Sequence, residues 1–343
     1  MQISISNCIK GSVIKSGLSP VNSVAPVISG TATVGSILTS TTGTWIGSLP
    51  ITYTYQWLRN GLNISGATSS TYTLVTADTS NVVSCRVTAT NSVGSANATS
   101  NSLTIYESEY KAILDYATTN SYTLPSEAQR LKQNTLLSSL KTSGVWTKLD
   151  TFANFATDGS TQFALIDWKR LTQYTAILSP TFTTNEGFTG NGTSSYISTN
   201  FNPTVGTNNY LQNNASRYIY TLNSVGLFDG IESFVDNRFT PSITTAQRIN
   251  QGTGTINSAY SYLSGAGMKS IHRTSSTNVE LFSGTTQASR TATSSAITNA
   301  NQLISRSFTT YSANKVSMYA MGASLVTENT DFVNAYNTYI SSL

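Results

Sequence analysis

The segment Tyr53-Thr54-Tyr55-Gln56-Trp57-Leu58 runs directly into Arg59-Asn60-Gly61. Side chains of a β-strand alternate between its two faces, so Tyr53, Tyr55 and Trp57 share one face. Asn-Gly favours a two-residue hairpin turn, because both residues adopt positive φ there. This segment therefore predicts a strand with one aromatic face that turns back in a tight hairpin.

Short strand-like runs recur before and after this hairpin, at the spacing typical of all-β domains. They lie at residues 37–38, 53–58, 72–75, 82–88 and 103–106. Turn residues separate the runs, so residues 25–106 are predicted to form one small β-sandwich.

The same region resembles bacterial and phage immunoglobulin-like domains. Trp57 holds the place of their core tryptophan, and residues 72–78, 84–91 and 91–96 are similar to their later strands and closing turn. The resemblance implies an immunoglobulin-like sandwich.

Two positions depart from the immunoglobulin-like pattern. Leu38 or a neighbour stands where the first cysteine would be, and Val83 replaces a tyrosine, so the inter-sheet disulfide is missing. Cys85 is therefore predicted to be a small core residue. A Cys8–Cys85 bridge is the alternative.

Residues 107–150 carry a helical pattern. Tyr110, Ile113, Leu114 and Ala117 recur at the spacing of one helix face. A second helix is predicted to start at Pro125-Ser126-Glu127 and to end at Gly144, a residue that tolerates the left-handed conformation. We expect its apolar face to consist of Ala128, Leu131, Leu136 and Leu140. The segment is predicted to be a short helical hairpin packed on the next domain.

Residues 151–343 return to β structure. Strand candidates lie at residues 152–155, 163–168, 196–201, 218–222, 279–282 and 316–320. One helix is predicted at the end, capped by Thr327 and carrying Asp331 in its first turn, with Phe332, Tyr336 and Ile340 recurring every four residues. A long run of strands closed by a short helix favours a two-sheet jelly roll. The predicted fold class is therefore mainly β: an immunoglobulin-like sandwich, a helical hairpin, and a jelly roll with a C-terminal helix.

A second resemblance covers this last region. Residues 187–197 are similar to the opening strands of concanavalin-like, laminin-G-type domains, and residues 318–325 to their final strand. The lead-in motifs, residues 115–117 and 124–126, resemble a module of phage virion proteins. The resemblance implies a virion protein of the fibre, decoration or tail-adhesion type, and a homo-oligomer.

Residues 1–24 are predicted to form an N-terminal arm. Ile3, Ile5 and Ile9 follow a loosely alternating, strand-like pattern. One interpretation is an extra strand on the neighbouring sandwich. A second is an anchor, in which these three residues add a strand to another virion protein. A third is simple disorder.

Composition excludes several classes of function. Charged residues are 10% of the 343 residues, against about 25% in a typical domain. One histidine and two cysteines are too few for a Cys/His zinc site. Basic residues are scattered along the sequence, which argues against binding of nucleic acid. The pair Lys169-Arg170 is predicted to lie in a solvated turn. There is no apolar run of about 18 residues, so we expect no membrane insertion. No cofactor-binding motif is present, so we expect no cofactor.

Carboxylates offer little for catalysis. Glycoside cleavage needs two of them about 5–10 Å apart, whereas Glu232 and Asp236 would lie about 13 Å apart along one strand. Asp158, in Asp158-Gly159-Ser160-Thr161, is predicted to sit in a capped turn and not a calcium site. His272 alternates with apolar neighbours and is predicted to be structural or exposed. We therefore expect no catalytic or metal site.

Glycan binding stays open. Sugar sites combine an aromatic side chain with planar polar groups, and Asn208, Tyr210, Gln212 and Asn214 crowd one loop together with Asn209. This loop is predicted to face glycan, with a plain solvated turn as the alternative.

The sequence thus favours a non-enzymatic structural or adhesion protein of a bacteriophage virion, a head fibre, decoration protein or tail-fibre subunit. Many weak contacts to host-surface or mucus glycans would hold it by avidity. One alternative is a polysaccharide depolymerase whose carboxylates come from Asp158, Asp167, Glu232 and Asp236. The other is a bacterial surface adhesin, for which neither end shows the expected export or sorting signal.

Overall fold

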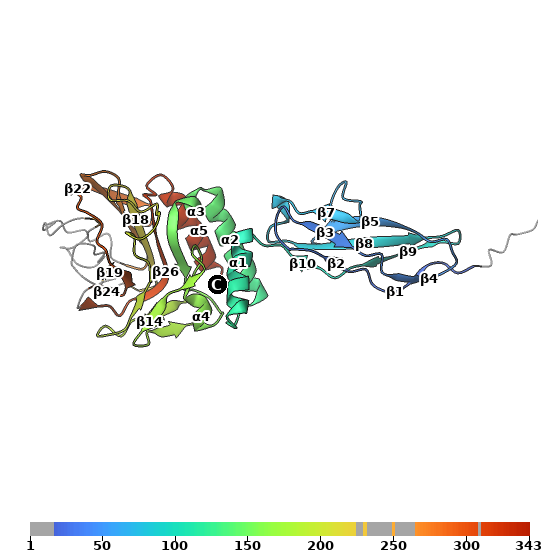
Figure 1. The fold of residues 1–343 in the computed structure, drawn as a ribbon, viewed down its shortest axis with the longest axis horizontal. Coiled ribbons are helices and arrows are strands. Elements are labelled where there is room, and N and C mark those ends of the chain that lie inside the picture. The colour runs from blue at the N-terminus through green and yellow to red at the C-terminus, as the bar shows by residue number, and fades with distance from the viewer. Residues whose placement is uncertain (1–16, 224–228, 232–248, 251–264, 308–309) are drawn as a thin grey trace, which may run out of the picture. The chain divides into compact units, whose positions relative to one another are not determined.

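The computed structural model describes residues 17–223, 229–231, 249–250, 265–307 and 310–343. The chain is mainly β and divides into two compact units, Met1–Tyr106 and Glu107–Leu343 (Figure 1). In the described part of the chain, no helix combines the length and apolarity that crossing a membrane requires. The predicted anchor residues Ile3, Ile5 and Ile9, and also Cys8, lie outside the described residues.

The first unit is a two-sheet sandwich. One sheet has the order β2-β3-β7, and the other has the order β10-β8-β5-β6 with β9 paired to β8. The strands are β1 Val21–Val24, β2 Ile28–Ser29, β3 Ile37–Ser40, β4 Thr44–Ile46, β5 Thr52–Arg59, β6 Leu62–Asn63, β7 Thr71–Thr73, β8 Val82–Thr90, β9 Ser95–Thr99 and β10 Leu103–Thr104. The predicted β-sandwich is confirmed.

Trp57 lies at the centre of this sandwich. It is fully buried with Leu38 and Cys85, and its indole Nε1 donates to the Ser69 carbonyl at 2.9 Å. Cys85 is fully buried in this core, so its prediction as a small core residue is confirmed. The alternative bridge involves Cys8, which lies outside the described residues. The predicted hairpin turn is also confirmed, because Asn60 and Gly61 have φ of 48° and 80°.

Residues 21–24 of the predicted arm belong to the first unit. They form β1, which pairs antiparallel with β4 so that Val21 stands opposite Ile46. This pairing matches the interpretation of the arm as an extra strand, for these four residues only.

The second unit has three layers. A larger sheet, β15-β16-β26-β18-β20-β21-β22 with β11 on β26, lies between a smaller sheet, β14-β17-β23-β19, and the helix α5 (Figure 1). The helices are α1 Ser108–Thr119, α2 Glu127–Thr142, α3 Val145–Lys148, α4 Thr161–Ala164 and α5 Asn329–Ser341. The strands are β11 Leu149–Asn154, β12 Ile166–Asp167, β13 Thr172–Gln173, β14 Thr175–Ile177, β15 Thr181–Thr183, β16 Gly187–Thr189, β17 Tyr196–Ser198, β18 Ala215–Thr221, β19 Asp229–Ile231, β20 Gly267–Arg273, β21 Asn278–Ser283, β22 Thr286–Thr291, β23 Gln302–Ile304, β24 Arg306–Ser307, β25 Thr310–Tyr311 and β26 Lys315–Gly322.

The central strands of the larger sheet, β18, β20 and β26, are buried on both faces. Ile219 on β18 packs into the core shared with the smaller sheet. Its neighbour Tyr218 points to the other face, where its ring lies 4.6 Å from that of Phe332 on α5. The alternation of side chains along each strand therefore separates a mixed aliphatic and aromatic core between the sheets from a second layer under α5, where Tyr218 packs on His272 and Phe332.

The two predicted helices before the second sandwich are α1 and α2, and α2 packs on α5. Ser126 caps α2 by accepting from the Gln129 N–H, and Gly144 has a φ of 77°, both as expected from the sequence. The predicted apolar face of α2 is partly wrong. Ala128 is exposed, whereas Gln129 and Gln133 are buried because both donate to the Tyr339 hydroxyl.

Two local predictions in the second unit are wrong. Residues 163–168 are not one strand, because Ser160 accepts from the Phe163 N–H and starts the short helix α4. Thr327 does not cap the last helix, since Glu328 is the N-cap residue and its side chain accepts no hydrogen bond from the first-turn N–H groups. Tyr339 is buried on α5, while Ile340 is half-buried.

Candidate functional site

Asp167, a candidate acid of the depolymerase alternative, is held by the fold. It is fully buried, and its carboxylate accepts from Thr151 Oγ1 at 2.6 Å and from Arg170 Nε at 2.5 Å. The backbone N–H groups of Lys169 and Phe152 donate to its other oxygen at 2.9 and 3.2 Å. The carboxylate therefore organises the turn that follows β12.

Other described acids are bound in the same way. Asp78 is fully buried and accepts from Arg59, from the Tyr72 hydroxyl and from the Val75 N–H at 2.7–2.9 Å. Asp158 accepts from the Ser126 N–H at 3.0 Å, in the predicted turn whose Ser160 caps α4. The described residues contain no group of three or more His, Cys, Asp or Glu side chains that could hold a metal ion. Glu232 and Asp236 lie outside the described residues.

His272 is a core residue. It is fully buried, and its ring lies edge-on to Tyr218 and Phe282 at about 5 Å. Burial lowers the pKa of His272 to about 3. The Leu325 N–H donates to Nδ1, so the imidazole proton resides on Nε2, which lies 2.9 Å from Ser270 Oγ. A protonated Nε2 cannot accept the serine proton, so this pair does not form a nucleophile and base.

The predicted glycan loop is only partly available to a ligand. Gln212 and Asn214 are exposed, but the Asn208 side chain donates to two carbonyls of its own loop. Tyr210 as a glycan-facing residue is wrong, because its ring is buried and its hydroxyl donates to Asn250 Oδ1 at 2.8 Å.

Asp150 explains why this loop turns its tyrosine inward. Its carboxylate accepts from the backbone N–H groups of Asn209 and Tyr210 at 2.8 and 2.7 Å. Burial raises the pKa of Asp150, and these hydrogen bonds oppose that shift. The Asn209 amide, which remains exposed, donates to the Thr147 carbonyl at 3.2 Å. The loop is thereby attached beside α3, where a pocket lies.

This pocket, called the indole pocket below, has a volume of about 370 Å³, within the range of small-molecule sites. It is formed by α1, α3 and the turn after β12. Its lining residues are Glu109, Ala112, Trp146, Thr147, Trp168, Lys169 and Leu171.

Aromatic packing fixes the two tryptophans of the indole pocket. Trp146 and Trp168 both contact Phe152, with ring centroids 6.0 and 5.4 Å apart, and Trp168 also packs on Tyr110 at 5.6 Å. The Trp168 indole N–H is buried and has no hydrogen-bond acceptor among the described residues. An unsatisfied buried donor is unfavourable, which makes it a feature that a ligand could relieve.

Lys169 and Leu171 form the turn side of the pocket. The Lys169 ammonium lies 4.4 Å from the centre of the Trp146 ring and donates to the Trp146 carbonyl at 2.8 Å. Burial lowers the pKa of Lys169. Leu171 has a φ of 51°, a region that bulky residues rarely adopt. The prediction of a solvated Lys169-Arg170 turn is wrong, because Lys169 covers an indole and Arg170 binds Asp167.

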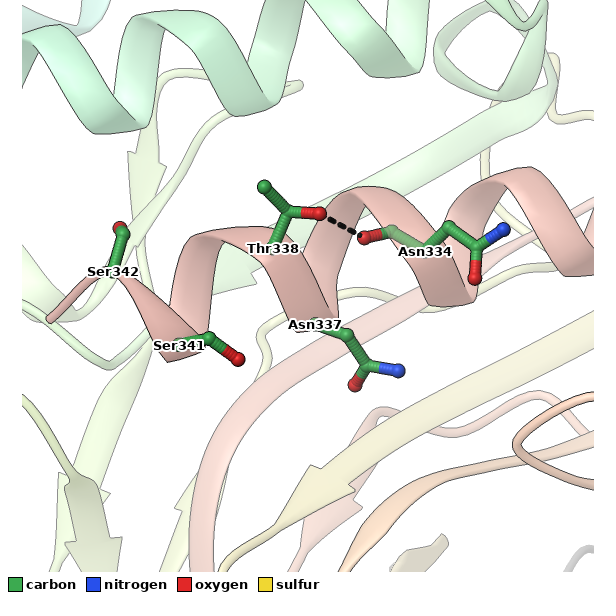
Figure 2. Close-up of a pocket in the computed structure, with 5 residues that line it drawn as sticks. All are labelled: Asn334, Asn337, Thr338, Ser341 and Ser342. Atoms are coloured by element: carbon green, nitrogen blue, oxygen red, sulfur yellow. Dashed lines mark hydrogen bonds between the residues drawn. The ribbon is translucent and has the colours of Figure 1, made fainter.

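A second hollow, of about 490 Å³, lies along the exposed side of α5 (Figure 2). It is lined by Asn334, Asn337, Thr338, Ser341 and Ser342. Figure 2 shows these side chains spread along the helix, with the Thr338 hydroxyl donating to the Asn334 carbonyl at 2.8 Å. The lining carries neither a charge nor an aromatic ring, so it is a weaker candidate than the indole pocket.

No protein-family model matches this sequence. No curated protein is similar to it. Among solved structures, the chain is similar to domain 4 of AbnA, a GH43 extracellular arabinanase from Geobacillus stearothermophilus in complex with arabinotriose. That match has 12% identity and a TM-score of 0.33, and covers 54% of this chain and 98% of the other. The chain is also similar to a Trypanosoma rangeli sialidase with 7% identity and a TM-score of 0.34, covering 75% of this chain and 44% of the other.

Proposed function

We propose that this protein is a non-enzymatic structural and adhesion component of a bacteriophage particle, a head fibre, decoration protein or tail-fibre subunit that binds host-surface or mucus glycans. The resemblance of residues 187–197 and 318–325 to laminin-G-type domains supports the adhesive role, and the phage-type lead-in supports the virion location. Copies of the chain would act together, so that weak contacts add up through avidity.

One observation carries the non-enzymatic part of this proposal. The buried carboxylates Asp78 and Asp167 each receive several hydrogen bonds from their own unit, and Asp150 holds a loop. A glycosidase acid must instead face substrate beside a second carboxylate. These three acids therefore favour stability over chemistry.

Retention on mucin tests the proposal directly. Purified protein is passed over immobilised mucin or host capsule and its oligomeric state is measured by light scattering. The proposal expects retention that increases with the number of linked copies. Absence of retention for the oligomer on every host glycan would contradict the adhesive role.

Immunogold labelling of phage particles tests the virion location. Antibody to this chain should decorate intact particles, and deletion of residues 1–16 should prevent incorporation while both units still fold. Unlabelled particles would contradict the location, and normal incorporation of the deleted chain would contradict the anchoring role of the arm.

A further inference from the structure

The indole pocket lies entirely within the second unit and contains polar groups that its own fold leaves with capacity for a ligand. We propose that it is a subsite for one neutral hexose unit of a glycan, with Trp168 Nε1 donating to a sugar hydroxyl and Glu109 accepting from another. This proposal rests on the proposed glycan-binding function and assigns it a place.

Trp168 supplies the donor. Its side chain is 98% buried, since only 2% of the residue is exposed, and its N–H has no acceptor among the described residues. Water does not reach this N–H in the structure, so the pocket lining must shift before a ligand oxygen bonds to it; the new hydrogen bond breaks none in the protein. Binding therefore gains the hydrogen bond of a buried polar group, less the cost of that shift.

Glu109 supplies the acceptor. Its carboxylate receives bonds from Lys141 at 2.7 Å and from Ser108 at 2.8 Å. An ionised carboxylate has about four lone-pair positions, so two remain for a ligand. A hydroxyl group both donates and accepts, and a sugar presents several of them in fixed positions. One donor and one acceptor in the same pocket therefore match a polyol.

Charge balance indicates a neutral sugar. The pocket is lined by one acid, Glu109, and one base, Lys169, and both already have partners: Glu109 binds Lys141, and Lys169 binds the Trp146 ring and carbonyl. No charge is left to select an acidic or a basic sugar. Ala112, Leu171 and the indole edges supply apolar surface for the C–H groups of the ring.

Packing and hydrogen bonds within the second unit hold the walls of the pocket. Trp146 and Trp168 pack on the same Phe152 ring, and Asp167 holds the turn that carries Lys169. Asn209, from the loop that the sequence marked for glycan, is attached to the pocket residue Thr147. A larger glycan could therefore extend from the pocket over exposed asparagine side chains.

Nuclear magnetic resonance of the indole N–H groups tests this subsite. The chain has four tryptophans, and Trp168→Phe and Trp146→Phe assign two of their signals. Full-length protein is titrated with methyl glucoside, methyl galactoside and N-acetylglucosamine. We expect the Trp168 signal to shift in a saturable way with at least one of them, while the signals of Trp45 and Trp57 stay in place.

Variants measure the contribution of each group. Trp168→Phe keeps the aromatic packing and removes the N–H, so affinity should fall about fivefold. Glu109→Gln, at the half-exposed rim, should weaken binding without lowering the melting temperature by more than a few degrees, which covers the case in which Trp168→Phe does not fold. Trp45→Phe, whose indole N–H donates to the Thr42 carbonyl at 2.7 Å, is the matched control and should bind normally.

Several results would overturn the subsite. They are the absence of a Trp168 shift with all three sugars, equal shifts of all four indole signals, and a response to N-acetylneuraminic acid alone. Unchanged mucin retention by Trp168→Phe together with no indole shift would reject the subsite and leave the adhesive function intact. A saturable Trp168 shift in a protein that mucin and capsule do not retain would reject the adhesive function and leave the subsite intact.

Discussion

Replacing Asp167 with asparagine tests whether the buried acids of this protein serve stability. The substitution keeps the shape and one carbonyl oxygen, so the N–H groups of Lys169 and Phe152 can retain their acceptor. The new amide N–H₂ then faces Arg170 Nε and Thr151 Oγ1, which both donate to the carboxylate in the native protein. The Arg170 donor would thus meet a second donor inside the core, while the Thr151 hydroxyl can turn to accept from the amide.

The expected cost is about 3 kcal/mol. Breaking a buried ion pair by removing one partner costs roughly 3–5 kcal/mol. The lower value applies here because 26% of the Arg170 side chain is exposed and water can take over part of its hydrogen bonding. For a unit of the size of Glu107–Leu343, 1 kcal/mol corresponds to about 2–4 °C. The melting temperature of the second unit should therefore fall by roughly 10 °C.

Scanning calorimetry of the full chain measures this effect. Only the transition of the second unit should move, while that of the first unit stays within error. Asp115→Asn is the control, because Asp115 is 61% exposed and pairs with Lys111 one helical turn away, a contact worth about 0.2–0.5 kcal/mol. Equal melting temperatures for Asp167→Asn and Asp115→Asn would refute the structural role of Asp167.

Three further predictions concern other parts of the chain. Gly322→Ala should destabilise the second unit by about 3 kcal/mol, because a Cβ there would lie 2.1 Å from the Lys148 carbonyl oxygen. Gly206→Ala is the control, since the space around Gly206 is open, and it should cost about 1 kcal/mol. Equal losses of unfolding free energy for the two variants in urea would contradict the close approach at Gly322. Burial of His272 lowers its pKa to about 3, so below pH 6.5 only the unfolded state binds its proton, and stability should fall by about 1.4 kcal/mol per pH unit between pH 6 and 3.5. His272→Gln should remove that part of the slope in urea unfolding at pH 6.5 and 4.5, and an unchanged slope would show that His272 is not its source. Cys85 is fully buried, and burial raises the pKa of its thiol. The thiol should therefore be alkylated only when the first unit unfolds. Alkylation at the rate of an exposed thiol would contradict its place in the core.

Local patterns were sufficient where neighbouring residues determine the structure. Asn60-Gly61 specifies its turn through backbone conformation alone. Trp57 of the predicted aromatic face enters the core with Tyr55 packed against it, whereas Tyr53 on that face is exposed. The spacing of Tyr110, Ile113, Leu114 and Ala117 likewise identified the buried face of α1.

Contacts between distant residues decided the features that the sequence did not reveal. Gln129 and Gln133 are buried because Tyr339, more than 200 residues later, accepts their amide hydrogens. Tyr210 turns inward because Asp150 holds its backbone N–H from 60 residues away. The indole pocket is assembled from α1, α3 and the turn after β12. The sequence places Trp146 and Trp168 on either side of the buried strand β11. That placement alone does not indicate a pocket.

The release of reducing ends from host glycan tests the central claim most directly. Purified protein is incubated with host capsule and with mucin, and new reducing ends are measured beside retention of the protein on the same material. We expect retention without release above the buffer level. Reproducible release that disappears in Glu232→Gln or Asp236→Asn would show a depolymerase and contradict the claim that this protein acts by adhesion.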